Sequence, residues 1–300
     1  MVTTETWTYD GFNLSNYVNG SRISEIRTWN GLDHIPGVNV SGNSTGTTSG
    51  TNGMFQLAQT HGEYWYPQYY TAATRLLTLH ISSNSPNDGS APSSINEARA
   101  NFDANLDFLT LLFSRRRNLA SLVRTLSSGQ QRLGLVTVDS VIEPTLVPVT
   151  DGMITVELTF PDPFWRDAYD SAIANNILPG FSGPVPSMRL GTAPINDAQF
   201  NIYGPATNPR VTDNESGHWW QYTGVVPSGK TLVVHNVSMS IDDGGSGWSP
   251  TLLDMNHSGD TNWLTLYPAY VNGGYNIEFS ASSTNGNTYL AINGHLKYMR

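Results

Sequence analysis

Apolar and polar residues alternate at every second position in several parts of the chain. The alternation is clearest at residues 133–140 and 154–160, and residues 75–81 form a short run rich in apolar side chains. A period of two places successive side chains on opposite faces of a strand, so these segments predict β-strands. The connection at 143–152 holds two prolines and an Asp-Gly turn, which favours antiparallel pairing of the strands at 133–140 and 154–160.

One segment has the periodicity of a helix. Ile95, Ala98, Phe102, Leu106, Leu109 and Phe113 recur at spacings of three and four, which predicts an apolar stripe on a helix over residues 95–113. Ser94 and Glu97 have the spacing of a capping box. The polar residues between the stripe positions, Asn105 among them, are expected to face away from the sheet on which the helix packs.

The pattern changes near residue 161. Residues 167–177 predict a short helical stretch, residues 179–187 a linker, and the alternating segments after Gly191 a β-sandwich with turns about every ten residues. We therefore expect a mainly β protein with an N-terminal β-rich domain at 1–185 that carries one packed helix, and a C-terminal sandwich at 191–300. The small-residue stretch at 36–53 predicts a long loop.

Composition narrows the function classes. Charged residues make up 13% of the chain, against about 25% in typical soluble proteins, and the net charge is −9. The acidic balance argues against nucleic-acid binding, and the basic run at 115–117 is interpreted as a helix C-terminus. Cysteine is absent, which excludes disulfides, thiolate zinc sites and a cysteine nucleophile. The start of the chain predicts no signal peptide, and no apolar run predicts a membrane span.

No catalytic motif is evident. The chain lacks the H-E-x-x-H and dinucleotide-binding motifs, and its seven histidines are scattered. Two carboxylate pairs, Asp167 with Asp170 and Asp242 with Asp243, are explained more simply by helix-surface and turn positions. We predict no catalytic residue, no cofactor and no metal site.

Aromatic residues are the remaining candidates for contact with a ligand or partner. The C-terminal region is rich in tryptophan and tyrosine, and most of these rings are expected to fill the core of the sandwich. Trp248 lies in a glycine-rich loop, which makes it the best candidate for a glycan or partner contact. Trp219 and Trp263 are the other two.

Several segments, taken in order, resemble the distal tail proteins of long-tailed bacteriophages. They are the β-rich start around residues 12–14 with the glycine-rich insertion near 42–53, the helix at 95–113, the phrase VELTFPDPFW at 156–165, and the segments 191–194, 200–205, 208–209, 217–224 and 227–232. The last group resembles the galectin-like C-terminal domain of that family. The resemblance covers nearly the whole chain, although the polar insertions at 36–53 and 82–94 depart from the pattern.

The resemblance implies a structural virion protein and not an enzyme. It implies a ring, commonly of six subunits, at the tail tip, assembled in the host cytoplasm, through which DNA passes without specific binding. The expected neighbours are the tail tube protein, the tail-associated tip protein, the tape measure protein, and receptor-binding or fibre proteins. Two alternatives remain open: a carbohydrate-binding module of the adsorption apparatus, which the tryptophans motivate, and a tail-tip glycosidase, which only the unassigned aspartates motivate.

Overall fold

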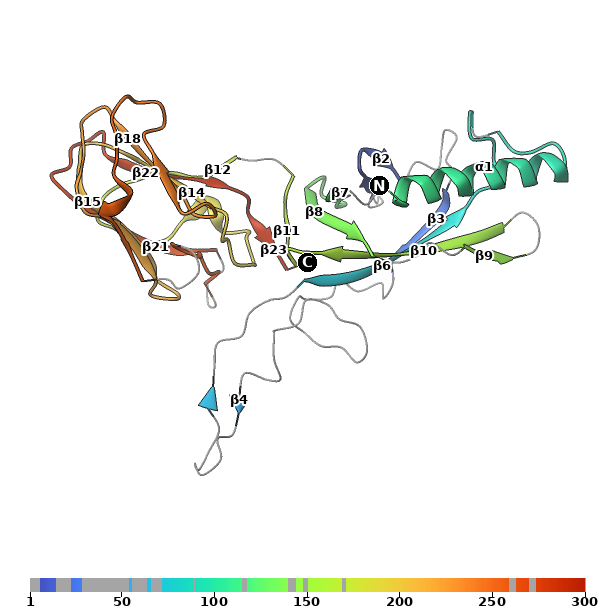
Figure 1. The fold of residues 1–300 in the computed structure, drawn as a ribbon, viewed down its shortest axis with the longest axis horizontal. Coiled ribbons are helices and arrows are strands. Elements are labelled where there is room, and N and C mark those ends of the chain that lie inside the picture. Colours follow the sequence, from blue (N-terminus) through green and yellow to red (C-terminus); the bar gives the residue numbers. More distant parts are fainter. Residues whose placement is uncertain are drawn as a thin grey trace. The chain divides into compact units, whose positions relative to one another are not determined.

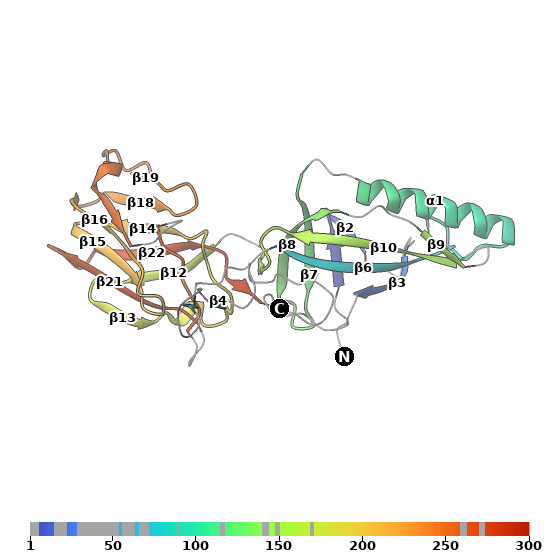
Figure 2. The ribbon, with the colours of Figure 1, turned by 60° about the horizontal axis from the view of Figure 1, so that its bottom comes forward.

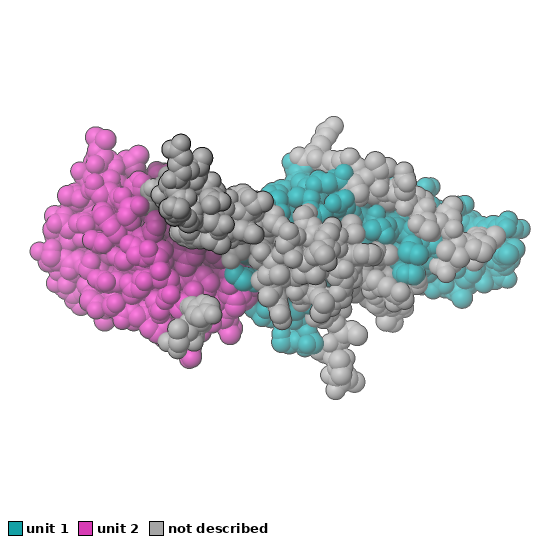
Figure 3. Space-filling model, turned by 90° about the horizontal axis from the view of Figure 1, so that it is seen from below, with its two compact units in different colours: residues 1–165, 299–300 teal, residues 166–298 magenta. Residues whose placement is uncertain are grey.

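The computed structural model divides the chain into two compact units, residues 1–165 with 299–300 and residues 166–298 (Figure 3). It describes residues 6–14, 23–28, 54–55, 64–65, 72–88, 90–114, 118–139, 144–147, 151–168, 171–258, 263–269 and 274–299. The predicted loop at 36–53, the basic run at 115–117 and Asp170 lie outside these residues. The expected boundary near 185–191 falls inside the second unit, because residues 166–185 already contribute strands to it.

The first unit is built on an antiparallel sheet. Its strand order is β2-β1-β7-β8-β10-β6-β3, with β9 also paired to β10 (Figures 1 and 2). The strands are β1 (Thr6–Tyr9), β2 (Phe12–Asn13), β3 (Ile23–Thr28), β6 (Ala73–Ile81), β7 (Ala120–Thr125), β8 (Gln131–Val138), β9 (Pro144–Val147) and β10 (Asp151–Phe160). A separate pair is formed by β4 (Met54–Phe55) and β5 (Tyr64–Trp65). The predicted antiparallel pairing is confirmed where Leu158 and Thr159 of β10 oppose Val138 and Thr137 of β8.

The predicted helix is α1 (Ile95–Ser114), which runs along one face of this sheet beside β6 and β10 (Figures 1 and 2). Ser94 caps it, because its hydroxyl accepts the backbone N–H of Glu97 at 3.2 Å. The Glu97 carboxylate reaches back one residue further than predicted, to the backbone N–H of Ser93 at 2.7 Å. These bonds satisfy backbone donors that have no partner within the first turn.

The expectation that Asn105 faces away from the sheet is wrong. Its side chain is 0% exposed, and its amide donates to the carbonyls of Ser82 at 2.8 Å and Asn84 at 3.1 Å. The amide thereby supplies donors to two carbonyls of the backbone that leaves β6. Ile95, predicted to lie on the apolar stripe, is instead 62% exposed.

The second unit is a sandwich of two antiparallel sheets. One sheet has the order β12-β22-β14-β18-β19 and the other β13-β21-β15-β16-β20, with β17 paired to β15. The first contains β12 (Ser171–Ile177), β14 (Gln199–Tyr203), β18 (Thr231–His235), β19 (Ser240–Asp242) and β22 (Tyr289–Gly294). The second contains β13 (Phe181–Pro184), β15 (Ala206–Asp213), β16 (Trp219–Tyr222), β17 (Val225–Val226), β20 (Met255–His257) and β21 (Asn276–Ser282). Phe200 of one sheet meets Trp220 of the other edge to face at 5.6 Å, and both rings are fully buried.

Two predictions around residues 167–187 are wrong. The stretch at 167–177 contains strand β12 and not a helix, and the expected linker at 179–187 contains β13 and the short 3-10 helix η1 (Pro186–Met188). The buried residues of β12 are Ile173, Ala174 and Ile177, whose spacing imitates one side of a helix. That spacing arises because the register with β22 shifts twice along β12, so the strand loses strict alternation.

The end of the chain returns to the start of the second unit. In β11 (Trp165–Asp167), the Asp167 backbone N–H donates to the carbonyl of Leu296 at 3.0 Å. The Tyr298 hydroxyl, in β23 (Lys297–Tyr298), donates to the Asp167 carboxylate at 2.7 Å. Within the described part of the chain, no helix is long and apolar enough to cross a membrane.

Candidate functional site

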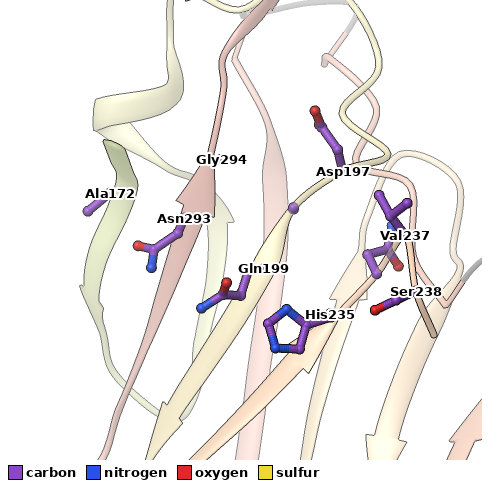
Figure 4. A pocket seen from close by; sticks show the side chains of 10 residues that line it. Ala172, Asp197, Gln199, His235, Val237, Ser238, Asn293 and Gly294 are labelled. Carbon is purple, nitrogen blue, oxygen red and sulfur yellow. The ribbon is translucent and has the colours of Figure 1, made fainter. Parts of the chain in front are cut away.

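The outer face of the sheet that contains β14 carries polar side chains at neighbouring positions. Along β14, Phe200 and Ile202 point into the core, so Gln199, Asn201 and Tyr203 lie on the outer face. Gln199 is paired in register with Asn293 of β22 on one side and with His235 of β18 on the other. Three adjacent strands therefore present two amides and an imidazole in one row (Figure 4).

These three residues line a groove of about 580 Å³. Ala172 on β12 lies at one end of the row, while Val237 and Ser238, which follow β18, lie at the other (Figure 4). Ala172 has only a methyl side chain, so little projects above the sheet at that end of the groove.

The row is partly held by its own hydrogen bonds. The Gln199 amide donates to Asn201 Oδ1 at 2.9 Å, and His235 Nε2 lies 2.6 Å from Asp242 Oδ2. The pKa of Asp242 is lowered, first by the backbone N–H of Gly244 and then by His235, so this carboxylate is charged at neutral pH. These bonds leave Gln199 Oε1, His235 Nδ1 and the whole Asn293 amide without a hydrogen-bond partner among the described residues.

The loop beside the groove is fixed from beneath by Asn236. This side chain is 1% exposed, and its amide donates to the carbonyls of Asn196 at 2.6 Å and Leu264 at 2.7 Å. Its oxygen accepts the backbone N–H of Leu264 at 2.8 Å. A fully bonded amide of this kind holds the backbone at Val237 and Ser238 in one position.

The Asp197 carboxylate at the edge of the groove is neutralised by a buried lysine. Lys297 is 1% exposed, and its ammonium lies 3.5 Å from Asp197 Oδ1 and donates to Asn196 Oδ1 at 2.7 Å. His295 Nδ1 lies 3.9 Å from Asp197 Oδ2. The one carboxylate among the described lining residues of the groove is therefore paired with a cation.

The three predicted tryptophan contacts do not form one site. Trp263 is 3% exposed and belongs to the core. Trp219 is half-buried, and the Arg210 guanidinium stacks over its ring at 4.3 Å. Trp248 is also half-buried, and its indole N–H donates to the Thr231 carbonyl at 2.8 Å.

The predicted carboxylate pairs do not make a catalytic centre either. The Asp243 carboxylate accepts the backbone N–H groups of Gly245, Gly247 and Trp248 at 3.0, 2.6 and 3.0 Å, which is a turn function. These bonds, led by that from Gly245, lower its pKa. Asp242 pairs with His235, and Asp167 accepts the Tyr298 hydroxyl. Among the described residues, no three histidine or carboxylate side chains are placed to hold a metal ion.

The row of Gln199, His235 and Asn293 was not predicted from the sequence. The three residues are separated by 36 and 58 positions, and only the strand order β22-β14-β18 makes them neighbours. Each of the three alternates with buried residues along its strand, and the same alternation occurs in any strand that has one solvent-exposed face.

Comparison with known proteins gives a whole-chain likeness in structure only. No family model and no curated protein matches the sequence. The chain is similar to the crystal structure of the Dit protein (gp 19.1) of phage SPP1, which is described as a paradigm of the hub adsorption apparatus in phages that infect Gram-positive bacteria. The match covers 98% of this chain and 99% of the SPP1 chain, with a TM-score of 0.54 and 13% sequence identity. The two chains share a fold. The phage p2 baseplate structure, in its activated conformation with Sr, matches at 11% identity and a TM-score of 0.36, with 97% of this chain and 98% of that chain covered.

Proposed function

We propose that this chain is a structural hub protein of a bacteriophage tail tip. The observation that carries the proposal is the extent of the likeness to the SPP1 hub protein, which includes both units and leaves almost nothing of either chain unmatched. A shared sandwich alone would say little, because that architecture serves many functions. A β-rich unit with one packed helix followed by a sandwich, in one order and over one length, is a far more restrictive combination.

The hub is a ring of identical subunits, with six as the expected number, closed by the N-terminal units around a channel. Identical head-to-tail contacts close into a ring when the rotation per subunit divides a full turn. In the described part of the first sheet, β2 and β3 end the strand order, and edge strands of this kind offer backbone groups to a neighbouring chain. Six subunits of net charge −9 would carry 6 × −9 = −54, a charge that would not retain passing DNA.

The remaining partners follow from this position. The ring joins the tail tube protein to the tail-associated tip protein, close to the tape measure protein. The galectin-like sandwiches project outward, where receptor-binding or fibre proteins attach. In this proposal the chain acts by assembly and catalyses no reaction.

Sedimentation and negative-stain microscopy of the purified full-length chain test the proposal. We expect a closed ring with about six times the subunit mass of 32.8 kDa. A chain that stays monomeric at high concentration, both alone and when mixed with the tail tube and tip proteins of the same phage, would contradict it.

A further inference from the structure

The groove on the outer face of the β14 sheet has the chemistry of a site for a neutral polyhydroxylated ligand. A hydroxyl group both donates and accepts hydrogen bonds, so neighbouring hydroxyls are best met by groups that offer both functions. The Asn293 amide offers a carbonyl and an amino group, Gln199 offers a free Oε1, and His235 offers a free Nδ1. These groups lie on adjacent strands, which are separated by about 4.8 Å in a sheet.

Other ligand classes fit the groove less well. None of the described residues that line it is a lysine or an arginine, so the groove lacks the permanently charged side chains that hold a phosphate or carboxylate most strongly. Its single carboxylate, Asp197, already faces Lys297, which leaves no free charge for a cation. Among the described residues that line the groove, Val237 is the only large apolar side chain, which is too little for a lipid or an apolar peptide.

A pair of aromatic rings lies further along the same face. Tyr203 and Tyr289 stack at 4.2 Å between ring centres with an interplanar angle of 19°, and both are half-buried. Tyr203 lies four positions after Gln199 along β14, which corresponds to about 13 Å. Aromatic rings present an apolar face and a polar hydroxyl, and both contact sugar rings well.

We propose that this face binds a neutral saccharide of a cell-surface polysaccharide, with Asn293, Gln199 and His235 as its hydrogen-bonding residues and the Tyr203–Tyr289 pair at the far end. The site is preorganised, because Asn236 fixes the adjoining loop and Asp242 orients the His235 ring. It does not include two of the tryptophans expected from the sequence. Trp263 is buried in the core, and Trp219 lies on the other sheet of the sandwich.

The test uses the full-length protein on a printed array of bacterial cell-surface glycans, followed by calorimetry with the strongest hit. We expect binding to at least one neutral glycan. The affinity should fall at least tenfold in Asn293→Ala and in Gln199→Ala, and it should be undetectable in the double variant. Gln221→Ala is the matched control, since Gln221 is a half-buried glutamine on the β16 strand of the other sheet. It should bind as the unaltered protein does.

Three results would overturn the proposal. They are the absence of binding to any neutral glycan, unchanged affinity in the Asn293→Ala and Gln199→Ala variants, and loss of binding in Trp219→Ala in place of those two. Thermal unfolding of each variant shows that the sandwich is intact. Ring formation is measured separately by sedimentation, so a ring without glycan binding removes this proposal and leaves the proposed function standing.

Discussion

At the scale of single residues, several buried polar groups hold the backbone where the strands end. Asn105 in the first unit and Asn236 in the second are each almost fully buried, and each bonds to the backbone of a distant segment. Sequence patterns miss such residues, because a lone asparagine in a helix or after a strand is usually solvated. Their positions become evident only once the strands that they brace are in place.

Asn105→Leu tests this bracing role. The substitution keeps the volume similar but leaves the carbonyls of Ser82 and Asn84 without their donor, so we expect a loss of about 1–3 kcal/mol in the free energy of unfolding. Urea denaturation measures the loss. Asp103→Ala, at an exposed position of the same helix, is the control and should change stability by less than about 0.5 kcal/mol. Equal effects of the two changes would refute the bracing role.

Asp213 is a buried carboxylate of the second unit with a raised pKa. The carboxylate is 0% exposed and accepts the Ser216 N–H at 2.9 Å, the Ser216 hydroxyl at 2.6 Å and the Tyr267 N–H at 3.2 Å. Burial nevertheless raises its pKa above the ordinary value of 3.8. A raised pKa in the folded state contributes stability that is complete below the unfolded pKa and is lost as the pH rises through the folded pKa.

We therefore expect the protein to lose stability relative to its Asp213→Asn variant as the pH rises from about 4 to about 7. Thermal unfolding of both proteins across that range supplies the measurement, and their difference cancels contributions from the other titrating groups. If the difference in stability between the two proteins stays constant or changes in the opposite direction, the hydrogen bonds to the Asp213 carboxylate offset or outweigh its desolvation.

At the scale of elements, sequence periodicity predicts those helices and strands whose form depends on residues close together in the chain. It fails for strands whose form depends on pairing with a distant strand. The helix and its Ser94 cap were predicted correctly, apart from Ile95 and the bonding partner of Glu97, because these features depend only on residues a few places apart. The β12 strand was mistaken for a helix because its shifted register is set by β22, more than a hundred residues later. The groove was missed for the same reason: its three strands meet only in the folded sheet.

The capping interaction can be tested within α1. Ser94→Ala removes the acceptor for the Glu97 N–H, and we expect a cost of about 1 kcal/mol. Ser94→Asp keeps an acceptor and adds a negative charge at the helix N-terminus, so its stability should remain close to that of the unaltered protein. Urea midpoints of the three proteins provide the comparison. If Ser94→Asp loses as much as Ser94→Ala, the side-chain cap does not stabilise this helix.

At the scale of the whole molecule, the two proposals place assembly and recognition in different units. The proposed ring contacts belong to the first unit and the proposed saccharide groove to the second. The second unit has its own core, in which rings such as Phe200 and Trp220 pack between two sheets without help from residues before 166. A unit that buries its own core is expected to fold without its neighbour.

A fragment spanning residues 166–300 is therefore expected to unfold cooperatively and to sediment as a monomer, while the full chain forms the ring. Circular dichroism and sedimentation of both proteins at equal subunit concentration test this. The fragment should bind the glycan with the affinity of a single site. It should lose only the additional affinity that a ring gains by binding through several sites at once. If the fragment alone assembles into rings, the contacts that close the hub lie in the sandwich, and the assignment of assembly to the first unit is wrong.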